Sequence, residues 1–307
     1  MRQCHIVFST LAFLGTLCFI PPSFSNEEWI QIRSGKAYGI SGIAWIDRHQ
    51  EAMKFLVVHD NKADYPERLA IVSIPRQGQP QYLPLDWSEN SELPTDLESL
   101  VAVGGNNSRF MTLSSRGRVY DFTLDIAKGT IEIIQTFDLP DIAAGSNFEG
   151  FALARIQGKQ VVAWAHRGEG EDPGILYWGE LDLDRGKVFP VGRLEVRVPL
   201  PTGNPRHISD LKIEDTGRVW IGSATDPGDE GLFDSAVYTI GQFQIEGEAI
   251  AFQAEPTLTP TAIYPGHKIE AIEFLPHSQG DRIFGTDDEN AGGFVRIDRF
   301  SEPVNRS

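Results

Sequence analysis

Apolar and polar positions along the chain form a short pattern that recurs five times. It consists of an apolar residue, then Glu or Ser, then a small residue or Asp, then a second apolar residue. The copies lie at residues 40–43, 97–100, 148–151, 208–211 and 269–272. Their second positions are 57, 51, 60 and 61 residues apart. A recurrence of that length is typical of a propeller or a solenoid.

The content of one repeat favours the propeller. In the fourth repeat, residues 207–213 alternate between apolar and polar, and residues 215–217 (Asp-Thr-Gly) predict a turn. Residues 218–223, 236–245 and 249–254 then supply three more strands, and no stretch has a helical period. A repeat of four antiparallel strands is a propeller blade.

The last repeat has only two strands after its motif strand, at 282–285 and 294–297. Residues 29–34 precede the first motif and belong to no blade, so we expect them to form the missing outer strand and protect the open edges. The predicted fold is all-β. It is a single β-propeller of five four-stranded blades closed by an N-terminal strand, with six blades as the alternative.

Residues 1–25 have the pattern of a secretory signal peptide. Arg2 precedes an apolar stretch at 6–20, and residues 23–25 end it as Ser-Phe-Ser. This predicts cleavage before Asn26, an exported protein (periplasmic or secreted) that is not inserted in a membrane after cleavage, and a propeller domain over 26–307. An uncleaved anchor is the alternative, although the apolar stretch is short for a membrane span.

Both cysteines, Cys4 and Cys18, fall in this leader. The predicted mature chain therefore has no disulfides, thiolate nucleophiles or cysteine metal ligands.

The net charge is −16, and loss of Arg2 makes it −17. Such a chain repels nucleic acid and anionic membranes and favours cations. We expect a monomer.

Propeller geometry places the start of each innermost strand and the end of each second strand at the same mouth. Glu98, Glu149 and Glu270 occupy the second motif position, so we expect a ring of carboxylates there. Oxygen ligands of this kind suit Ca²⁺, with another divalent cation as the alternative. The glutamates have a purely structural alternative role, in which they accept hydrogen bonds from backbone N–H groups of neighbouring blades.

Further polar residues are expected at the same mouth. The additional candidate metal ligands are Asp210, Asp226 and Asp288. The candidate catalytic residues are Asp287 or His59, to activate a water, and Arg167, to hold an anionic substrate group. For the aspartates, ordinary turn chemistry is the alternative explanation.

Residues 147–153 (Asn-Phe-Glu-Gly-Phe-Ala-Leu) resemble the N-x-x-E-G-φ-A signature of the phytase-like, or esterase-like, bacterial β-propellers, and residues 96–100 and 268–272 are looser copies. The resemblance implies an exported propeller whose carboxylates bind calcium and which hydrolyses esters or phosphoesters. Carried over residue by residue, it covers Glu98, Glu149 and Glu270. The phytases proper have six blades, and their D-G-x-D-D-P-A segment and dense basic clamp are absent here. The Glu-Gly pair is also similar to that of gluconolactonase-like propellers, in which a Glu holds a divalent ion.

Two functions from different classes follow. The first is a calcium-dependent hydrolase that cleaves an ester, a phosphoester or a lactone of a small anionic molecule at the channel mouth. The second is a non-catalytic propeller that binds a ligand or a protein on its acidic face and holds calcium only for structure.

Overall fold

The computed structural model describes residues 28–299 except 50, 63, 105, 141, 230, 277 and 279. The predicted leader lies outside the described residues. Within them, no helix combines the length and apolar character needed to cross a membrane.

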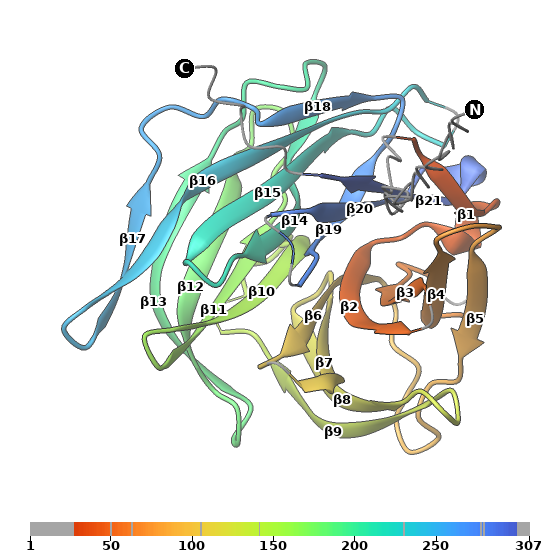
Figure 1. Cartoon of the computed structure of the whole chain (residues 1–307). Coiled ribbons are helices and arrows are strands. Elements are labelled where there is room, and N and C mark those ends of the chain that lie inside the picture. Colours follow the sequence, from red (N-terminus) through yellow and green to blue (C-terminus); the bar gives the residue numbers. More distant parts are fainter. Residues whose placement is uncertain are drawn as a thin grey trace, which may run out of the picture.

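Five antiparallel sheets surround a common centre, as Figure 1 shows. The first blade contains β2 (Gly42–His49), β3 (Ala52–Val58), β4 (Leu69–Pro75) and β5 (Gln81–Leu85). The second contains β6 (Leu97–Val103), β7 (Asn106–Ser114), β8 (Arg118–Asp125) and β9 (Thr130–Asp138). The third contains β10 (Phe148–Ile156), β11 (Lys159–His166), β12 (Gly174–Asp182) and β13 (Lys187–Val196). The predicted five-bladed propeller is confirmed, and the six-bladed alternative is wrong.

The fourth blade contains β14 (Pro205–Ile213), β15 (Arg218–Thr225), β16 (Asp234–Glu246) and β17 (Ala249–Ala254). It also has a fifth strand, β18 (Ala262–Pro265), which the sequence pattern did not predict. β16 is thirteen residues long, so its first half pairs with β18 and its second half with β17. The outer position of this blade is therefore shared by two short strands.

The fifth blade confirms the predicted closure. Its sheet order is β1 (Ile30–Arg33), β21 (Gly293–Asp298), β20 (Arg282–Thr286) and β19 (Ile269–Phe274). Ile30 pairs with Val295 and Gln31 with Phe294, so the first strand completes the last blade. Two short 3₁₀ helices, η1 (Lys36–Tyr38) and η2 (Glu289–Ala291), contact each other beside this junction.

The core is divided among the junctions between blades. Five clusters of buried apolar side chains are found among the described residues, and each is built from two adjacent blades. Between the first and second blades, for example, Leu56 packs with Phe110 and Phe122, which are all fully buried. Burying one such side chain stabilises the fold by about 1.5–3 kcal/mol. No blade has a core of its own, so the blades stabilise one another.

The third motif position sets how closely neighbouring inner strands approach. A Cβ on Gly42 would lie 2.7 Å from the backbone nitrogen of Leu100 in the next blade, and a Cβ on Gly150 would lie 2.5 Å from the Cβ of Leu211. Both distances are too short for a larger residue, which explains the glycines at these positions.

In two other blades the residue at this position has a polar side chain that forms hydrogen bonds with the backbone of the next blade. Ser99 Oγ donates to the carbonyl of Phe151 at 3.3 Å and accepts from its N–H at 3.0 Å. Asp210 Oδ2 accepts from the N–H of Ile272 at 2.6 Å. In all four cases the third motif residue contacts the fourth motif residue of the next blade, so the same contact recurs at four of the five blade junctions.

Replacing Gly150 by Ala tests this contact. The new methyl group clashes with Leu211, and we expect a loss of about 1–3 kcal/mol in the free energy of unfolding, measured by urea denaturation. Gly158→Ala is the control, because this turn glycine has open space around it and carries only the cost of its positive φ of 90°, about 1 kcal/mol. An unfolding midpoint of Gly150→Ala equal to or above that of the control would contradict the contact.

Candidate functional site at the acidic mouth

A β-bulge directs the second motif residue in three blades, at Glu98, Glu149 and Glu270. Around Glu149, Phe148 pairs with His166 and Gly150 pairs with Ala165, so Glu149 is the extra residue. A bulge of this kind leaves one residue out of the ladder and re-aims its side chain. The repeated irregularity therefore brings three carboxylates from three blades to one place.

These glutamates line a single cavity of about 100 Å³ at the mouth. Every residue of its lining is polar: Asp60, Lys62, Asp96, Glu98, Asn147, Glu149, Arg167, Arg206, Lys268, Glu270, Asp287 and Glu289. Seven of them carry carboxylates and four are basic. We call this cavity the acidic mouth.

Two of the glutamates are paired with basic side chains of the protein. Glu149 Oε1 lies 3.3 Å from Arg167 Nη1, and the other terminal nitrogen of Arg167 binds Glu169 at 3.1 Å. Glu270 Oε1 lies 2.9 Å from Arg206 Nη1. These pairs neutralise one side of the acidic mouth without any outside cation.

Lys268 is the centre of this neutralised side. Its ammonium group is almost fully buried, and four carboxylates surround it: Glu289 at 2.7 Å, Asp287 at 2.9 Å, Glu270 at 3.4 Å and Asp226 at 3.9 Å. Burial alone would lower the pKa of Lys268, but the nearby carboxylates outweigh it and raise the pKa. Lys268 therefore stays charged and acts as an internal cation.

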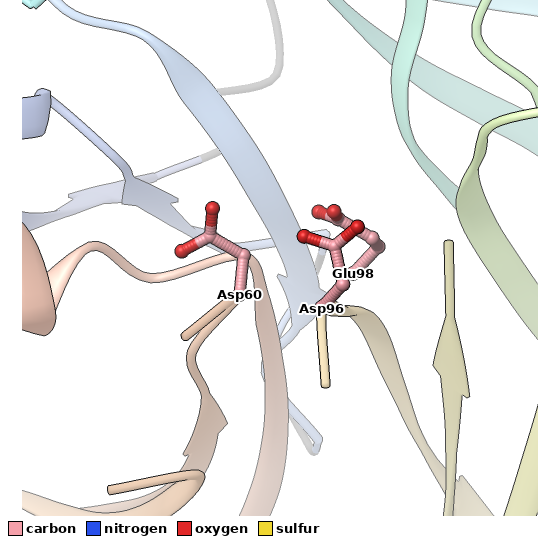
Figure 2. Close-up of side chains that lie close together, drawn as sticks. All are labelled: Asp60, Asp96 and Glu98. Atoms are coloured by element: carbon pink, nitrogen blue, oxygen red, sulfur yellow. The ribbon is translucent and has the colours of Figure 1, made fainter. Parts of the chain in front are cut away.

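The opposite side of the cavity contains a different cluster, formed by Asp60, Asp96 and Glu98. One oxygen of each carboxylate lies within 4.8 Å of the others. Figure 2 shows the three side chains close together, with Asp96 and Glu98 overlapping in this view and Asp60 beside them. Asp96 binds Lys62 at 3.1 Å and also accepts a hydrogen bond from Ser115, whereas Asp60 and Glu98 form no ion pair or hydrogen bond with any described residue. We call these three residues the carboxylate cluster.

The electrostatics of the cluster differ from those of the neutralised side. Burial raises the pKa of Glu98 well above its usual range, and the charges of Glu149 and Asp60 add to this effect. Burial likewise raises the pKa of Asp60 to about 7, with a further contribution from Asp287. Because a buried carboxylate needs a proton or a cation, the cluster fits a hard divalent cation that prefers oxygen ligands.

The backbone around the cluster is held firmly. Asp96 has a φ of 63°, a conformation uncommon outside glycine, and it is fixed there because its N–H donates to Asn61 O and its carbonyl accepts from Ser115 N–H. The strained residue is thus one of the three clustered carboxylates.

Arg68 organises the two loops that carry these side chains. It is 2% exposed, and its guanidinium donates to the carbonyls of Lys62 (2.9 Å), Glu67 (3.1 Å), Tyr65 and Pro94. The loop after Asp60 and the segment before Asp96 are therefore joined by one buried side chain. Sequence reasoning missed Arg68, Asp60 and Asp96 as site residues, although the end of a second strand and the residue before a motif were visible signals for the two aspartates.

The predicted metal ligands are separated by the structure. Glu98 belongs to the carboxylate cluster, whereas Glu149, Glu270 and Asp226 are ion-paired, the last with Arg206. Burial opposes ionisation of Asp226, but the charges of Arg206 and Lys268 outweigh it and lower its pKa.

The other two predicted ligands are hydrogen-bonded away from the cluster. Asp288 accepts from the N–H of Lys268 at 2.7 Å and binds His267 Nδ1 at 2.6 Å, and it does not line the cavity. Asp210 lies between blades, bound to Ile272 as described above.

The predicted catalytic residues also differ in position. Asp287 lines the acidic mouth beside Lys268, and Arg167 lines it beside Glu149. His59 is buried and does not line the cavity; its Nδ1 donates to the carbonyl of Gly39 at 2.5 Å, and its Nε2 accepts from the Tyr82 hydroxyl at 3.0 Å. Burial lowers the pKa of His59 to about 4, so the ring is neutral at ordinary pH.

Comparison with known proteins supports the fold. No family model matches the sequence, and no curated protein matches it. Among solved structures, an exo-1,5-α-L-arabinanase from a bovine ruminal metagenomic library has a TM-score of 0.52 and 10% identity, over 90% of this chain and 97% of that one. A protein described as a glycoside hydrolase has a TM-score of 0.51 and 9% identity, over 89% and 63%.

A GH43 endo-arabinanase from Bacillus licheniformis has a TM-score of 0.49 and 11% identity, over 88% of this chain and 96% of that one. At these identities, the two structures with TM-scores above 0.5 show a shared β-propeller fold. They do not support the narrower resemblance to phytase-like or esterase-like propellers.

Lys268→Met tests the internal cation. The variant leaves four carboxylates around an apolar side chain, so we expect it to lose about 3–5 kcal/mol of unfolding free energy at pH 7. Lys62→Met is the matched control, because the Lys62 side chain is 70% exposed and its ion pair contributes less than about 1 kcal/mol. Similar losses in the two variants, measured by urea denaturation, would contradict the role given to Lys268.

Asp210→Asn tests a pH effect. Burial raises the pKa of Asp210 to about 8, although Lys212 opposes the shift. The folded state therefore binds this proton more tightly than the unfolded state, and its contribution to stability is lost as pH rises from about 4 to about 8. We expect the unfolding free energy of the wild type to fall relative to that of Asp210→Asn over this range, by at most about 1.4 kcal/mol per pH unit. Parallel pH profiles would rule the effect out.

Proposed function

We propose that the protein is a divalent-cation-dependent hydrolase that acts at the acidic mouth. Calcium is the expected cation, and an ester, a phosphoester or a lactone is the expected substrate. The observation that carries the proposal is the carboxylate cluster: Asp60 and Glu98 lie in a polar cavity with no partner of their own, beside Asp96. Elsewhere in the same cavity the chain supplies its own cations.

Charge balance supports an outside cation. Seven carboxylates minus four basic groups leave an excess of three negative charges in the lining when all are ionised. A doubly charged ion reduces this excess to one. An anionic substrate group then meets less repulsion, and it can approach the partly exposed Arg167.

In this proposal one group of residues holds the cation and another residue accepts a proton. Asp60, Asp96 and Glu98 would hold the cation, which when bound polarises an attacked carbonyl or phosphoryl group and lowers the pKa of a coordinated water. Asp287 lines the same cavity, and Lys268 fixes one of its oxygens at 2.9 Å. Burial raises the pKa of Asp287, which suits a group that accepts a proton from water.

Glycoside hydrolysis is the second candidate. Two solved structures with TM-scores above 0.5 bear the names of an arabinanase and a glycoside hydrolase, and the raised pKa of Glu98 is the property of a general acid. A pair of carboxylates performs that reaction without a cation. Dependence on a divalent ion therefore separates the two candidates.

The proposal places the reaction outside the cytoplasm, because residues 1–25 have the pattern of a cleavable leader. N-terminal sequencing of the protein released by a cell that expresses the full chain should read from Asn26.

Calorimetric titration with Ca²⁺ tests the proposal. We expect Glu98→Gln to weaken binding at least about tenfold, because it removes one of three clustered charges. Glu149→Gln is the matched control: it occupies the same bulge position in the next blade but is paired with Arg167, so binding should change by less than about threefold. Equal effects of the two variants would contradict the assignment of the cluster.

Turnover decides between the functions. A panel of ester, phosphoester, lactone and arabino-oligosaccharide substrates is assayed with and without a chelator. Hydrolysis of one of the first three classes that stops with the chelator supports the proposal. Chelator-insensitive cleavage of oligosaccharides favours the second candidate, and calcium binding without any turnover favours a non-catalytic binding protein.

A further inference from the structure

The inner strands end at the face opposite the acidic mouth, and three adjoining depressions lie there. The central one has a volume of about 440 Å³ and lies over the ends of β6, β10, β14 and β19. It shares Ala102 and Leu153 with a depression of about 590 Å³ between the second and third blades. It shares Leu275 and Pro276 with one of about 360 Å³ between the fifth and first blades. We call the three together the far groove.

A buried side chain separates the far groove from the acidic mouth. Lys212 Nζ, on β14, lies 3.1 Å from Glu273 on β19 and donates to the carbonyls of Ile43 on β2 (3.3 Å) and Leu100 on β6 (3.2 Å). The side chain thus crosses the centre of the ring and contacts three other inner strands. A ligand in the far groove would not reach the carboxylate cluster, so the two sites are independent.

The walls of the far groove combine apolar and polar side chains in similar measure. The apolar side chains of the central depression include Val101, Leu153, Ile213, Phe274 and Leu275. On the floor, Glu273 already accepts from the N–H groups of Trp45 and Phe274 as well as from Lys212. A depression of several hundred cubic ångströms has the size of a site for a small organic molecule, and the apolar side chains of its walls can contact the apolar part of such a ligand.

The ends of the far groove carry positive charge. Arg155 lines the depression between the second and third blades, and Arg48 lines the one between the fifth and first blades. Both are exposed, and neither forms an ion pair with any described residue. In a chain of net charge −16, unpaired guanidinium groups at a groove are suited to a carboxylate, which they bind through two parallel hydrogen bonds.

Among the remaining charged groups of the groove, Asp281 and Arg299 line the depression that contains Arg48, and both have partners of their own. Glu214 accepts from Trp220 and Thr216, and Arg109 is bound to Asp121. Asp215 is exposed at the rim of the central depression and also lines the one that contains Arg155. Its negative charge disfavours a carboxylate at the centre, so the guanidinium groups at the ends are the better positions.

We infer that the far groove is a second ligand site, for an amphipathic molecule with an apolar chain and a terminal carboxylate. The chain would lie against the apolar walls, and the carboxylate would bind Arg155 or Arg48. The inference does not depend on the proposed function, because neither the carboxylate cluster nor a cation takes part.

Calorimetry with decanoate in the presence of a chelator tests the inference. We expect saturable binding that is weakened about tenfold or more in the double variant Arg48→Gln/Arg155→Gln, because the charge-assisted hydrogen bonds are lost. Arg193→Gln, an exposed arginine on the outer strand β13, is the matched control and should leave the affinity unchanged. Decanol and decylamine should bind about tenfold more weakly than decanoate.

Ala102→Phe tests the position of the chain, since Ala102 lines two of the three depressions. The larger side chain should abolish decanoate binding, whereas Ala102→Ser should retain it. The inference is overturned by an absence of saturable binding, by equal binding of decylamine, by an equal effect of Arg193→Gln, or by normal binding to Ala102→Phe. It is also overturned if the groove is an interface between two copies, seen as a dimer in light scattering that Ala102→Phe dissociates.

Discussion

The close approach of five inner strands around one axis is the constraint on which the site depends. Neighbouring inner strands touch where a third motif residue meets the fourth motif residue of the next blade, and glycine or a small hydrogen-bonding side chain permits that contact. In three blades a bulge turns the second motif residue inward, so Glu98, Glu149 and Glu270, which are 51 and 121 residues apart in the chain, meet in one small polar cavity.

The crowded carboxylates repel one another, and their negative charge is compensated in different ways on the two sides of the cavity. On one side the compensation is internal, because Arg206 of the fourth blade and Lys268 of the fifth blade form ion pairs with the carboxylates. Around Glu98 the chain supplies no buried cation, and protons or an outside ion must compensate. The asymmetry, rather than the number of acidic residues, makes one side of the cavity the better candidate for a bound ion.

The architecture could be predicted well from the sequence because each blade of a propeller corresponds to one sequence repeat. Strand number and the closing strand follow from the alternation within strands and the average spacing of about 57 residues between motifs, whereas the inward direction of the second motif residue depends on β-bulges that no local pattern shows. Strand β18 was not predicted, since its pairing depends on the length of β16 rather than on a local pattern.

The site was predicted only in part. Nothing local shows that Glu149 and Glu270 meet Arg167 and Arg206 while Glu98 meets Asp60, because those partners come from loops of other strands. The four carbonyls that Arg68 binds are likewise set by how two loops fold against each other. Such pairings depend on tertiary structure.

The pairing of β1 with β21 has a consequence for how the molecule forms. The earliest described strand to leave the ribosome finds its partner only when the final blade has been made, so the longest-range contact in the fold is also the last available. Until then, the apolar surfaces of the first and fifth blades have no cover. Before the seam closes, these apolar surfaces are open to association with other chains, and opening the seam in the folded protein uncovers both neighbouring blades at once.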